Sequence, residues 1–187
     1  MRLQVPPAVC LRRLRPRPRG STTFLFADLV GFTELAERRG DEVAADVAAA
    51  FVRDVDRLAC RHGARRVKSL GDGVMVVAST PEGAVVLGTE LLQRVRAHPD
   101  LPSVRIGVHS GRAVRRGRDW YGHAVNVAAR LNAAAAPDQV LVSDTTRRLL
   151  ASRPELSLEV GRDLTLRGVR TPIRVWEAPV IPAPWAR

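Results

Sequence analysis

Two aspartates occupy positions from which a carboxylate can bind a metal ion. Asp28 lies near the end of the apolar segment TTFLFADLV (22–30). A carboxylate that ends a buried strand is costly unless it is paired, so Asp28 is either a metal ligand or a cap of the next turn. Asp72 lies in KSLGDGVMV, where Gly-Asp-Gly is also common hairpin-turn chemistry. On neighbouring strands, the two carboxylates could hold two metal ions about 3.5–4 Å apart, an arrangement that catalyses in-line phosphoryl displacement.

A second pair of polar residues has the spacing of one helix face. Asn126 and Arg130 are four residues apart in HAVNVAARLNAAA (123–135), so on a helix they point the same way. The guanidinium fork of arginine fits phosphate oxygens, and electrostatic stabilisation is usually a large catalytic contribution. The alternative is a polar stripe that faces solvent, but the alanines around it favour a closely packed and therefore positioned face.

The elements that must position these residues follow from hydrophobic periodicity and turn signals. The patterns predict strands at 22–30, 103–114 and 139–143, a hairpin at 65–79, helices at 41–63, 81–98, 123–135 and 144–152, a turn at 31–33, a charged loop at 115–122 and a β-ribbon at 157–178. The order predicts an α+β fold with a ferredoxin-like βαββαβ core and additional C-terminal helices and strands. We expect a flexible basic Pro/Arg-rich tail at 1–21 and one catalytic domain at 22–187.

Composition narrows the class of protein. The net charge of +11 suggests a nucleic-acid binder, but the first 20 residues contribute six arginines and no acid, and aromatics are only 4% of the 187 residues. No apolar run approaches the roughly 20 residues of a membrane span, and the basic start lacks the apolar region of a secretory signal. Its arginines also resemble a transit peptide, although prolines interrupt any amphipathic helix. We therefore expect a cytoplasmic protein with no membrane and no nucleic-acid partner.

Four segments together resemble a known family. FADLVGFT, KSLGDGVMV, VRIGVHSG and DWYGHAVNVAARL are similar to the signature segments of class III adenylyl/guanylyl cyclases, in the same order and with similar spacing. The resemblance runs from Thr22 to Ala178. It implies a class III nucleotidyl cyclase fold and an adenylate cyclase that converts ATP to 3′,5′-cyclic AMP and pyrophosphate. The ribose 3′-hydroxyl would attack the α-phosphate in line, with two divalent metal ions, Mg²⁺ or Mn²⁺, as cofactors.

The resemblance also assigns roles to residues. It implies that Asp28 and Asp72 bind the two metals, that Asn126 positions the ribose and that Arg130 stabilises charge on the α-phosphate. Four further residues are expected to bind the substrate's phosphates: Phe32 and Thr33 through the backbone at a helix N-terminus, and Arg105 and Arg167 through their side chains. Arg167 stands where members of the family often carry a lysine. An arginine at this position keeps the positive charge but changes the geometry of the phosphate contact.

The choice of base is implied by one further pair. Adenine N1 accepts a hydrogen bond and its N6 amino group donates one, so a matching pocket needs one donor and one acceptor. Lys68 and Asp119 stand where adenylyl members of the family carry this pair, whereas guanylyl members commonly carry Glu and Cys. Taken singly, Lys68 is an ordinary strand lysine and Asp119 an ordinary loop acid. His109, which has no supporting acid nearby in sequence, is expected to be a packed strand histidine.

Class III sites form between two domains in a head-to-tail dimer. One protomer gives the metal carboxylates and Arg105, and its partner gives the base-reading pair, Asn126 and Arg130. This chain holds one set of both halves, so the resemblance implies a homodimer with two shared active sites. Within these 187 residues it leaves little room for a separate regulatory domain.

The sequence alone does not determine the strength of the dimer or choose one function. The segment from Gly111 to Asp119 is shorter than the arm with which many relatives hold their partner, which is compatible with a weaker dimer or one that needs an activator. For the function, the sequence also allows a guanylate cyclase, a catalytically silent cyclase-like module that binds nucleotide or a regulatory partner, and a nucleic-acid binder built on the basic tail.

Overall fold

A seven-stranded sheet forms the centre of the molecule. The computed structural model describes residues 21–98, 100–150, 156 and 158–179. The sheet has the order β2-β3-β1-β4-β7-β9-β8, in which only the β4–β7 pair is parallel. Its strands are β1 (Thr22–Leu29), β2 (Ala64–Leu70), β3 (Gly73–Ala78), β4 (Val104–Gly111), β7 (Gln139–Ser143), β8 (Glu159–Leu164) and β9 (Ile173–Glu177). The order β2-β3-β1-β4 is that of a ferredoxin-like core, which confirms the predicted α+β fold.

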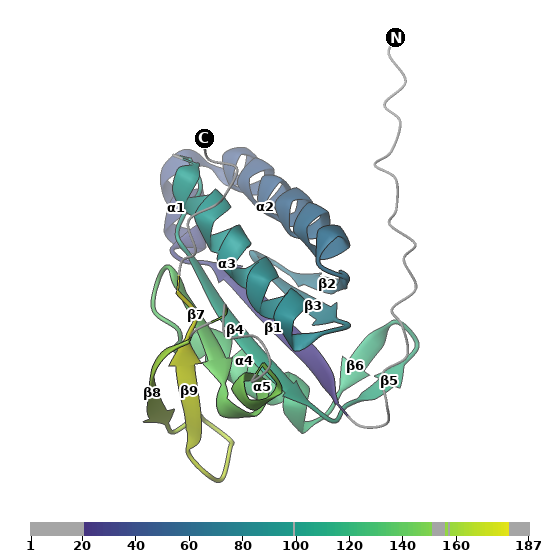
Figure 1. Cartoon of the computed structure of the whole chain (residues 1–187). Helices are drawn as coiled ribbons and strands as arrows, with labels where there is room; N and C mark the ends of the chain where they lie inside the picture. The colour runs from purple at the N-terminus through teal and green to yellow at the C-terminus, as the bar shows by residue number, and fades with distance from the viewer. Residues whose placement is uncertain (1–20, 99, 151–155, 157, 180–187) are drawn as a thin grey trace.

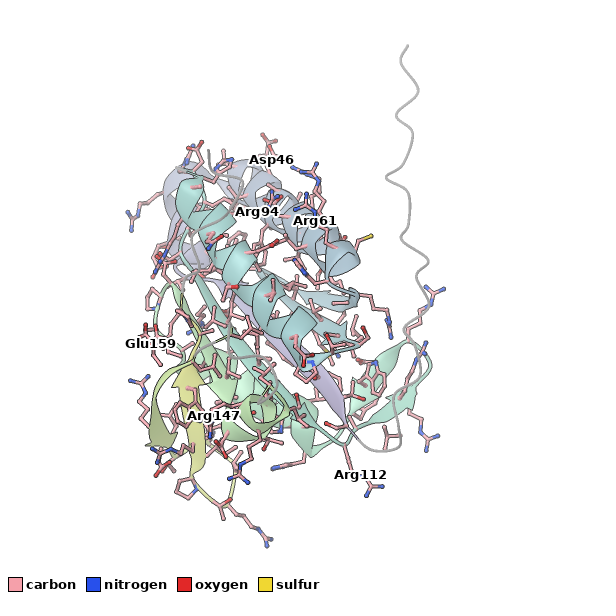
Figure 2. All side chains as sticks on the ribbon, viewed as in Figure 1. Asp46, Arg61, Arg94, Arg112, Arg147 and Glu159 are labelled. Atoms are coloured by element: carbon pink, nitrogen blue, oxygen red, sulfur yellow. The ribbon has the colours of Figure 1, made fainter. Side chains whose placement is uncertain are left out.

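Two long helices cover one face of this sheet (Figure 1). They are α2 (Asp41–Arg61) and α3 (Pro81–Ala97), and their apolar residues pack against Leu25 and Leu29 of β1 in the largest core cluster. Charged side chains such as Asp46 and Arg61 of α2 lie on the solvent side of this layer (Figure 2). An apolar stripe on one side of each helix is the pattern from which both were predicted.

One helix covers part of the opposite face. Because successive strand residues alternate between faces, Phe24 and Phe26 of β1 point away from α2 and α3. They pack instead against Ala124 and Ala128 of α4 (His123–Ala134). This approach is close, since a Cβ atom added to Gly107 of β4 would lie 2.2 Å from the backbone nitrogen of Asn132. The alanines and the glycine therefore set the height of α4 above the sheet.

Two local features differ from the sequence-based expectation. A short helix, α1 (Phe32–Arg39), follows β1, and Gly40 with φ of 85° separates it from α2; α1 has no buried residue, so hydrophobic periodicity did not indicate it. The segment predicted as a charged loop forms a small hairpin of β5 (Val114–Arg116) and β6 (Asp119–Tyr121), whose three-residue strands are too short to show alternation.

The other elements agree with their predicted positions, including α5 (Asp144–Leu149). The predicted tail at 1–21, except for Ser21, lies outside the described residues, as do residues 151, 152 and 157 of the predicted C-terminal elements. None of the helices within the described residues is long and apolar enough to cross a membrane.

Candidate active site

Strand register brings Asp28 to the end of the sheet between two neighbouring strands. Its Cα lies opposite Gly73 on β3 and opposite Arg105 on β4. The guanidinium of Arg105 donates two hydrogen bonds to the Asp28 carboxylate, at 2.8 and 2.9 Å, and the carboxylate is 21% exposed. A bidentate pair of this kind fixes the orientation of both side chains. The sequence predicted both residues as site residues and did not predict this contact.

Asp72 lies at the same edge, in the turn between β2 and β3. Its backbone oxygen accepts a hydrogen bond from the backbone N–H of Leu29, at 3.3 Å. Its negative charge also acts on Arg105, because the pKa of that guanidinium is raised first by the hydrogen bond that it donates to Asp28 and also by the charges of Asp28 and Asp72. The expectation that the two aspartates share one edge of the sheet is therefore met.

The donor set at this edge fits a hard divalent cation that is shared with a substrate. It offers two carboxylates, and the described residues contain no cluster of three or more His, Cys, Asp or Glu that could enclose a metal. Mg²⁺ characteristically binds to one or two carboxylates and completes its shell with water and phosphate oxygens. Gly73 keeps room here, since a Cβ at that position would lie 3.1 Å from the Cβ of Asp28. Asp28 and Asp72 are thus suited to hold such ions.

The N-terminus of α1 follows directly after this edge. Gly31 precedes the helix with φ of 75°, and no side chain of the described residues caps it. The first helical hydrogen bond of the segment runs from the backbone N–H of Leu35 to the carbonyl of Gly31, so the N–H groups of Phe32 and Thr33 have no partner within the helix. The ring of Phe32 packs against the core, and Thr33 is exposed. The backbone N–H of Phe32, rather than its ring, is therefore the group of this residue that the helix N-terminus offers to an anion.

Lys68 and Asp119 form an ion pair. The ammonium of Lys68, on β2, donates to Asp119 Oδ2 at 2.7 Å, and the two side chains are 41% and 28% exposed. The hydrogen bond from Lys68 lowers the pKa of the Asp119 carboxyl, as does the backbone N–H of Trp120, which donates to Oδ1 at 2.8 Å. The Trp120 ring meets Phe24 edge-on with centroids 5.6 Å apart, which anchors the small hairpin to the sheet. A donor and an acceptor are thus held side by side.

A hollow of about 370 Å³ brings together three other predicted residues. Asn126 and Arg130 of α4 line it together with Arg167 of the segment between β8 and β9. All three are exposed, and among the described residues none of their side chains has a hydrogen-bond or ion-pair partner. His123, three residues before Asn126, also lines the hollow and was not among the predicted site residues. Its position one helical turn before Asn126 is the signal from which it could have been found.

The predicted residues thus fall into three groups on one chain. The first is Asp28 with Asp72 and Arg105, the second is the Lys68–Asp119 pair, and the third lines the hollow beside α4. Within the described part of the chain, no hydrogen bond or ion pair joins one group to another.

His109 is a buried strand residue, as expected. It is 8% exposed, and its Nδ1 lies 2.8 Å from Ser143 Oγ. Burial, together with a smaller effect of the charge of nearby His123, lowers its pKa to about 4. A side chain with so low a pKa is a weak base, so His109 is poorly suited to abstract a proton near neutral pH.

Comparison with known proteins identifies the family. Residues 14–177 match the model of the adenylate and guanylate cyclase catalytic domain, and the chain belongs to this family. It is 36% identical over 160 residues to a pH-sensitive adenylate cyclase of Mycobacterium tuberculosis, covering 82% of this chain and 39% of that protein. It is 36% identical over 117 residues to an adenylate cyclase of Streptomyces coelicolor, covering 63% of this chain and 31% of that protein. The chain therefore spans less than half the length of these relatives.

Solved structures support the same fold. A Trypanosoma brucei adenylate cyclase aligns with a TM-score of 0.77 and 25% identity over 90% of this chain and 94% of that chain. An adenylate/guanylate cyclase/hydrolase from Silicibacter pomeroyi aligns with a TM-score of 0.75 and 27% identity over 84% and 95% of the two chains. The guanylate cyclase domain of a Catenaria anguillulae protein, solved with GTP, shares the fold at 20% identity and a TM-score of 0.73. The fold alone therefore does not choose between adenine and guanine.

Proposed function

We propose that the chain is an adenylate cyclase that converts ATP to 3′,5′-cyclic AMP and pyrophosphate. The observation that carries the choice of ATP is the ion pair of Lys68 and Asp119, in which an N–H donor and a carboxylate acceptor lie 2.7 Å apart. Adenine presents a donor at N6 and an acceptor at N1, which the two groups match together. Guanine carries an acceptor, O6, where adenine has its amino donor, so a pair fixed for adenine opposes it.

The edge with Asp28 and Asp72 is proposed as the metal end of the site. Two divalent cations bound there would favour the alkoxide form of the 3′-hydroxyl and offset charge on the departing pyrophosphate. Arg105 is held against the Asp28 carboxylate, and its guanidinium is therefore placed to bind phosphate oxygens beside it. The backbone N–H groups of Phe32 and Thr33 lie at a helix N-terminus, a position that favours anions, and are proposed to bind the phosphates of ATP.

The hollow beside α4 is proposed as the end that stabilises the reacting phosphate. Arg130 and Arg167 place two guanidinium groups on one cavity, and Asn126 adds an amide that can bind both a hydroxyl and a phosphate oxygen. Charge that develops on the α-phosphate during attack is stabilised by such preorganised donors. The side chains of this group are exposed and have no partner among the described residues, so they are available to a ligand from outside the chain.

We propose further that the active sites are shared in a head-to-tail homodimer. Within the described chain no hydrogen bond or ion pair joins the edge with Asp28 and Asp72 to Asn126, Arg130 or Arg167, yet the chemistry needs both groups around one ATP. A second copy of the chain supplies the missing group to each site. Mixing an Asp28→Ala protein with an Arg130→Ala protein under subunit-exchange conditions should then restore activity, since one intact site can form. A mixture no more active than the single variants refutes shared sites.

The first experiment measures the reaction itself. Purified protein is incubated with ATP and Mn²⁺ or Mg²⁺, and cyclic AMP is identified by mass, with GTP in a parallel reaction. Asp72→Ala should form no product, whereas Asp46→Ala, which removes an exposed acid of α2, should resemble the wild type. Preferential turnover of GTP would overturn the assignment of the Lys68–Asp119 pair. No product with either nucleotide from a dimeric protein would favour a silent nucleotide-binding module.

A further inference from the structure

A chain of hydroxyl groups beneath α5 fixes the tautomer of His109. Thr146 Oγ1 donates its one hydrogen to Ser110 Oγ at 3.1 Å. The hydrogen between Thr146 Oγ1 and Ser143 Oγ, 3.0 Å apart, must then belong to Ser143. Ser143 has no second hydrogen, so it accepts from His109 Nδ1, at 2.8 Å. A neutral imidazole with its hydrogen on Nδ1 carries a lone pair on Nε2.

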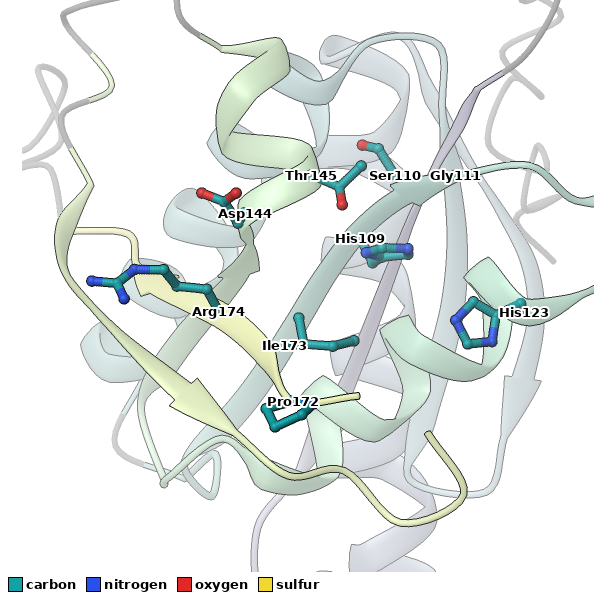
Figure 3. Close-up of a pocket in the computed structure, with 9 residues that line it drawn as sticks. All are labelled: His109, Ser110, Gly111, His123, Asp144, Thr145, Pro172, Ile173 and Arg174. Atoms are coloured by element: carbon teal, nitrogen blue, oxygen red, sulfur yellow. The ribbon is translucent and has the colours of Figure 1, made fainter. Parts of the chain in front are cut away.

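This lone pair belongs to a side chain that lines a hollow of about 410 Å³ (Figure 3). Among the described residues no donor is within hydrogen-bond distance of Nε2, although His109 is only 8% exposed. Gly111 helps to keep the nitrogen open, because a Cβ at that position would lie 3.2 Å from Nε2. The hollow is thus lined by a hydrogen-bond acceptor that no described residue uses.

Asp144 and Arg174, which line the hollow, each already have a partner of opposite charge. The Asp144 carboxylate binds Arg148 at 2.7 Å and Arg147 at 3.2 Å and accepts from Trp176 Nε1 at 3.1 Å. Arg174 lies 3.8 Å from the Asp163 carboxylate, donates to a backbone carbonyl of β8 and lies over the Trp176 ring. Neither of these two lining charges is therefore left for a ligand to neutralise.

The rest of the wall is apolar or neutral. Pro172 and Ile173 form the side that faces His109 in the close-up view, and Thr145 adds a hydroxyl (Figure 3). A volume near 400 Å³ lies within the usual range of small-molecule pockets, about 300–1,000 Å³. The lining combines an apolar surface with one acceptor atom of a largely buried side chain, which is a common way to fix the orientation of a small ligand.

We propose that this hollow is a second ligand site, which takes a small neutral molecule with an apolar body and one N–H or O–H donor for His109 Nε2. The site is distinct from the hollow beside α4, and none of the residues assigned to ATP lines it. His123 lines both hollows, at the first turn of the helix that carries Asn126 and Arg130. A ligand in the second site could therefore affect the proposed nucleotide site through His123 and α4.

Phenol and anisole are the matched probes for this proposal. Both have an aromatic ring of the right size, but only phenol has a donor, so their difference reports the hydrogen bond to Nε2. In ¹⁵N-labelled protein, the His109 resonances should show a protonated Nδ1 and an unprotonated Nε2 at neutral pH. Phenol should move the Nε2 resonance with a dissociation constant in the millimolar range, as expected for so small a ligand, and anisole should move it far less. His62 and His98, which do not line the hollow, serve as internal references.

The matched variant is His109→Asn. Its amide can still donate to Ser143 from the position of Nδ1, and it has no counterpart of Nε2. Phenol should therefore bind this variant much more weakly than the wild type. Calorimetry on the folded protein measures both affinities. A hydrogen on Nε2 in the wild type, equal responses to phenol and anisole, or unchanged phenol affinity in His109→Asn would each overturn the proposal. None of these measurements requires cyclase activity, so their failure is distinct from failure of the proposed function.

Discussion

Protonation of His109 should destabilise the fold as the pH falls. Burial opposes the imidazolium form and, together with the charge of His123, lowers the pKa of His109 to about 4, against 6.5 for an exposed histidine. Between these values the unfolded chain binds a proton that the native state excludes, so stability increases with pH. The contribution of His109 is therefore fully present above pH 6.5 and is lost progressively as the pH falls toward 4.

The size of the effect follows from the same two pKa values. Each unit of difference corresponds to about 1.4 kcal/mol, so the complete loss below pH 4 is about 3 kcal/mol and the loss at pH 5 is about 2 kcal/mol. A loss of this size is a large share of the stability of a typical domain. Urea unfolding of the wild type at pH 7, 6 and 5 measures it directly.

Two variants separate His109 from the other titrating groups. His109→Asn removes the buried imidazole and keeps a donor for Ser143, so its free energy of unfolding should fall by about 2 kcal/mol less than that of the wild type between pH 7 and pH 5. His98→Gln removes an exposed histidine and should follow the wild type. Only the change with pH is compared, because each substitution also shifts the stability at pH 7. Equal pH dependence in the wild type and His109→Asn would refute the argument from burial.

Three other variants, one of them a double substitution, have expected outcomes. Gly107→Ala would place a Cβ 2.2 Å from backbone of α4 and should lower the free energy of unfolding by about 3 kcal/mol, measured in urea. Replacing Lys68 by Glu together with Asp119 by Cys should shift the ratio of turnover from ATP toward GTP, and an unchanged ratio would contradict the role given to their ion pair. Gly73→Ala would crowd the Asp28 side chain at 3.1 Å and should raise the Mn²⁺ concentration for half-maximal activity by about tenfold, with little change in the preference for ATP over GTP.

The fold could be predicted largely because its strands and helices carry strong local patterns. The apolar run of β1, the Gly-Asp-Gly turn and the amphipathic stripe of α2 each indicated an element within a few residues of its bounds. The elements that were missed, α1 and the β5–β6 hairpin, lack such a pattern: α1 buries no residue, and each hairpin strand has three residues.

The site residues could be named from motif spacing, but their contacts could not. Asp28 and Arg105 are 77 positions apart, and their pairing depends on the register between β1 and β4. Lys68 and Asp119 meet only because the small hairpin, packed through Trp120 on Phe24 of β1, brings Asp119 within reach of β2, which the prediction of a loop did not contain. His109 was recognised as a packed histidine, whereas its free Nε2 follows from hydroxyl groups that lie elsewhere in the chain. Long-range register and hydrogen-bond direction are not encoded in any local pattern.

The β2–β3 hairpin joins two parts of the proposed chemistry in one rigid unit. Lys68 lies on β2, paired through the backbone with Met75 of β3, and Asp72 lies in the turn only four residues further on. Lys68 faces the small hairpin, whereas Asp72 faces the edge with Asp28, so neighbouring residues of one hairpin serve different groups. In a head-to-tail dimer they would belong to opposite active sites. Loss of the Asp72 carboxylate should then abolish turnover while base recognition by Lys68 persists, because the strand that carries Lys68 is held by its own backbone pairing and by Asp119.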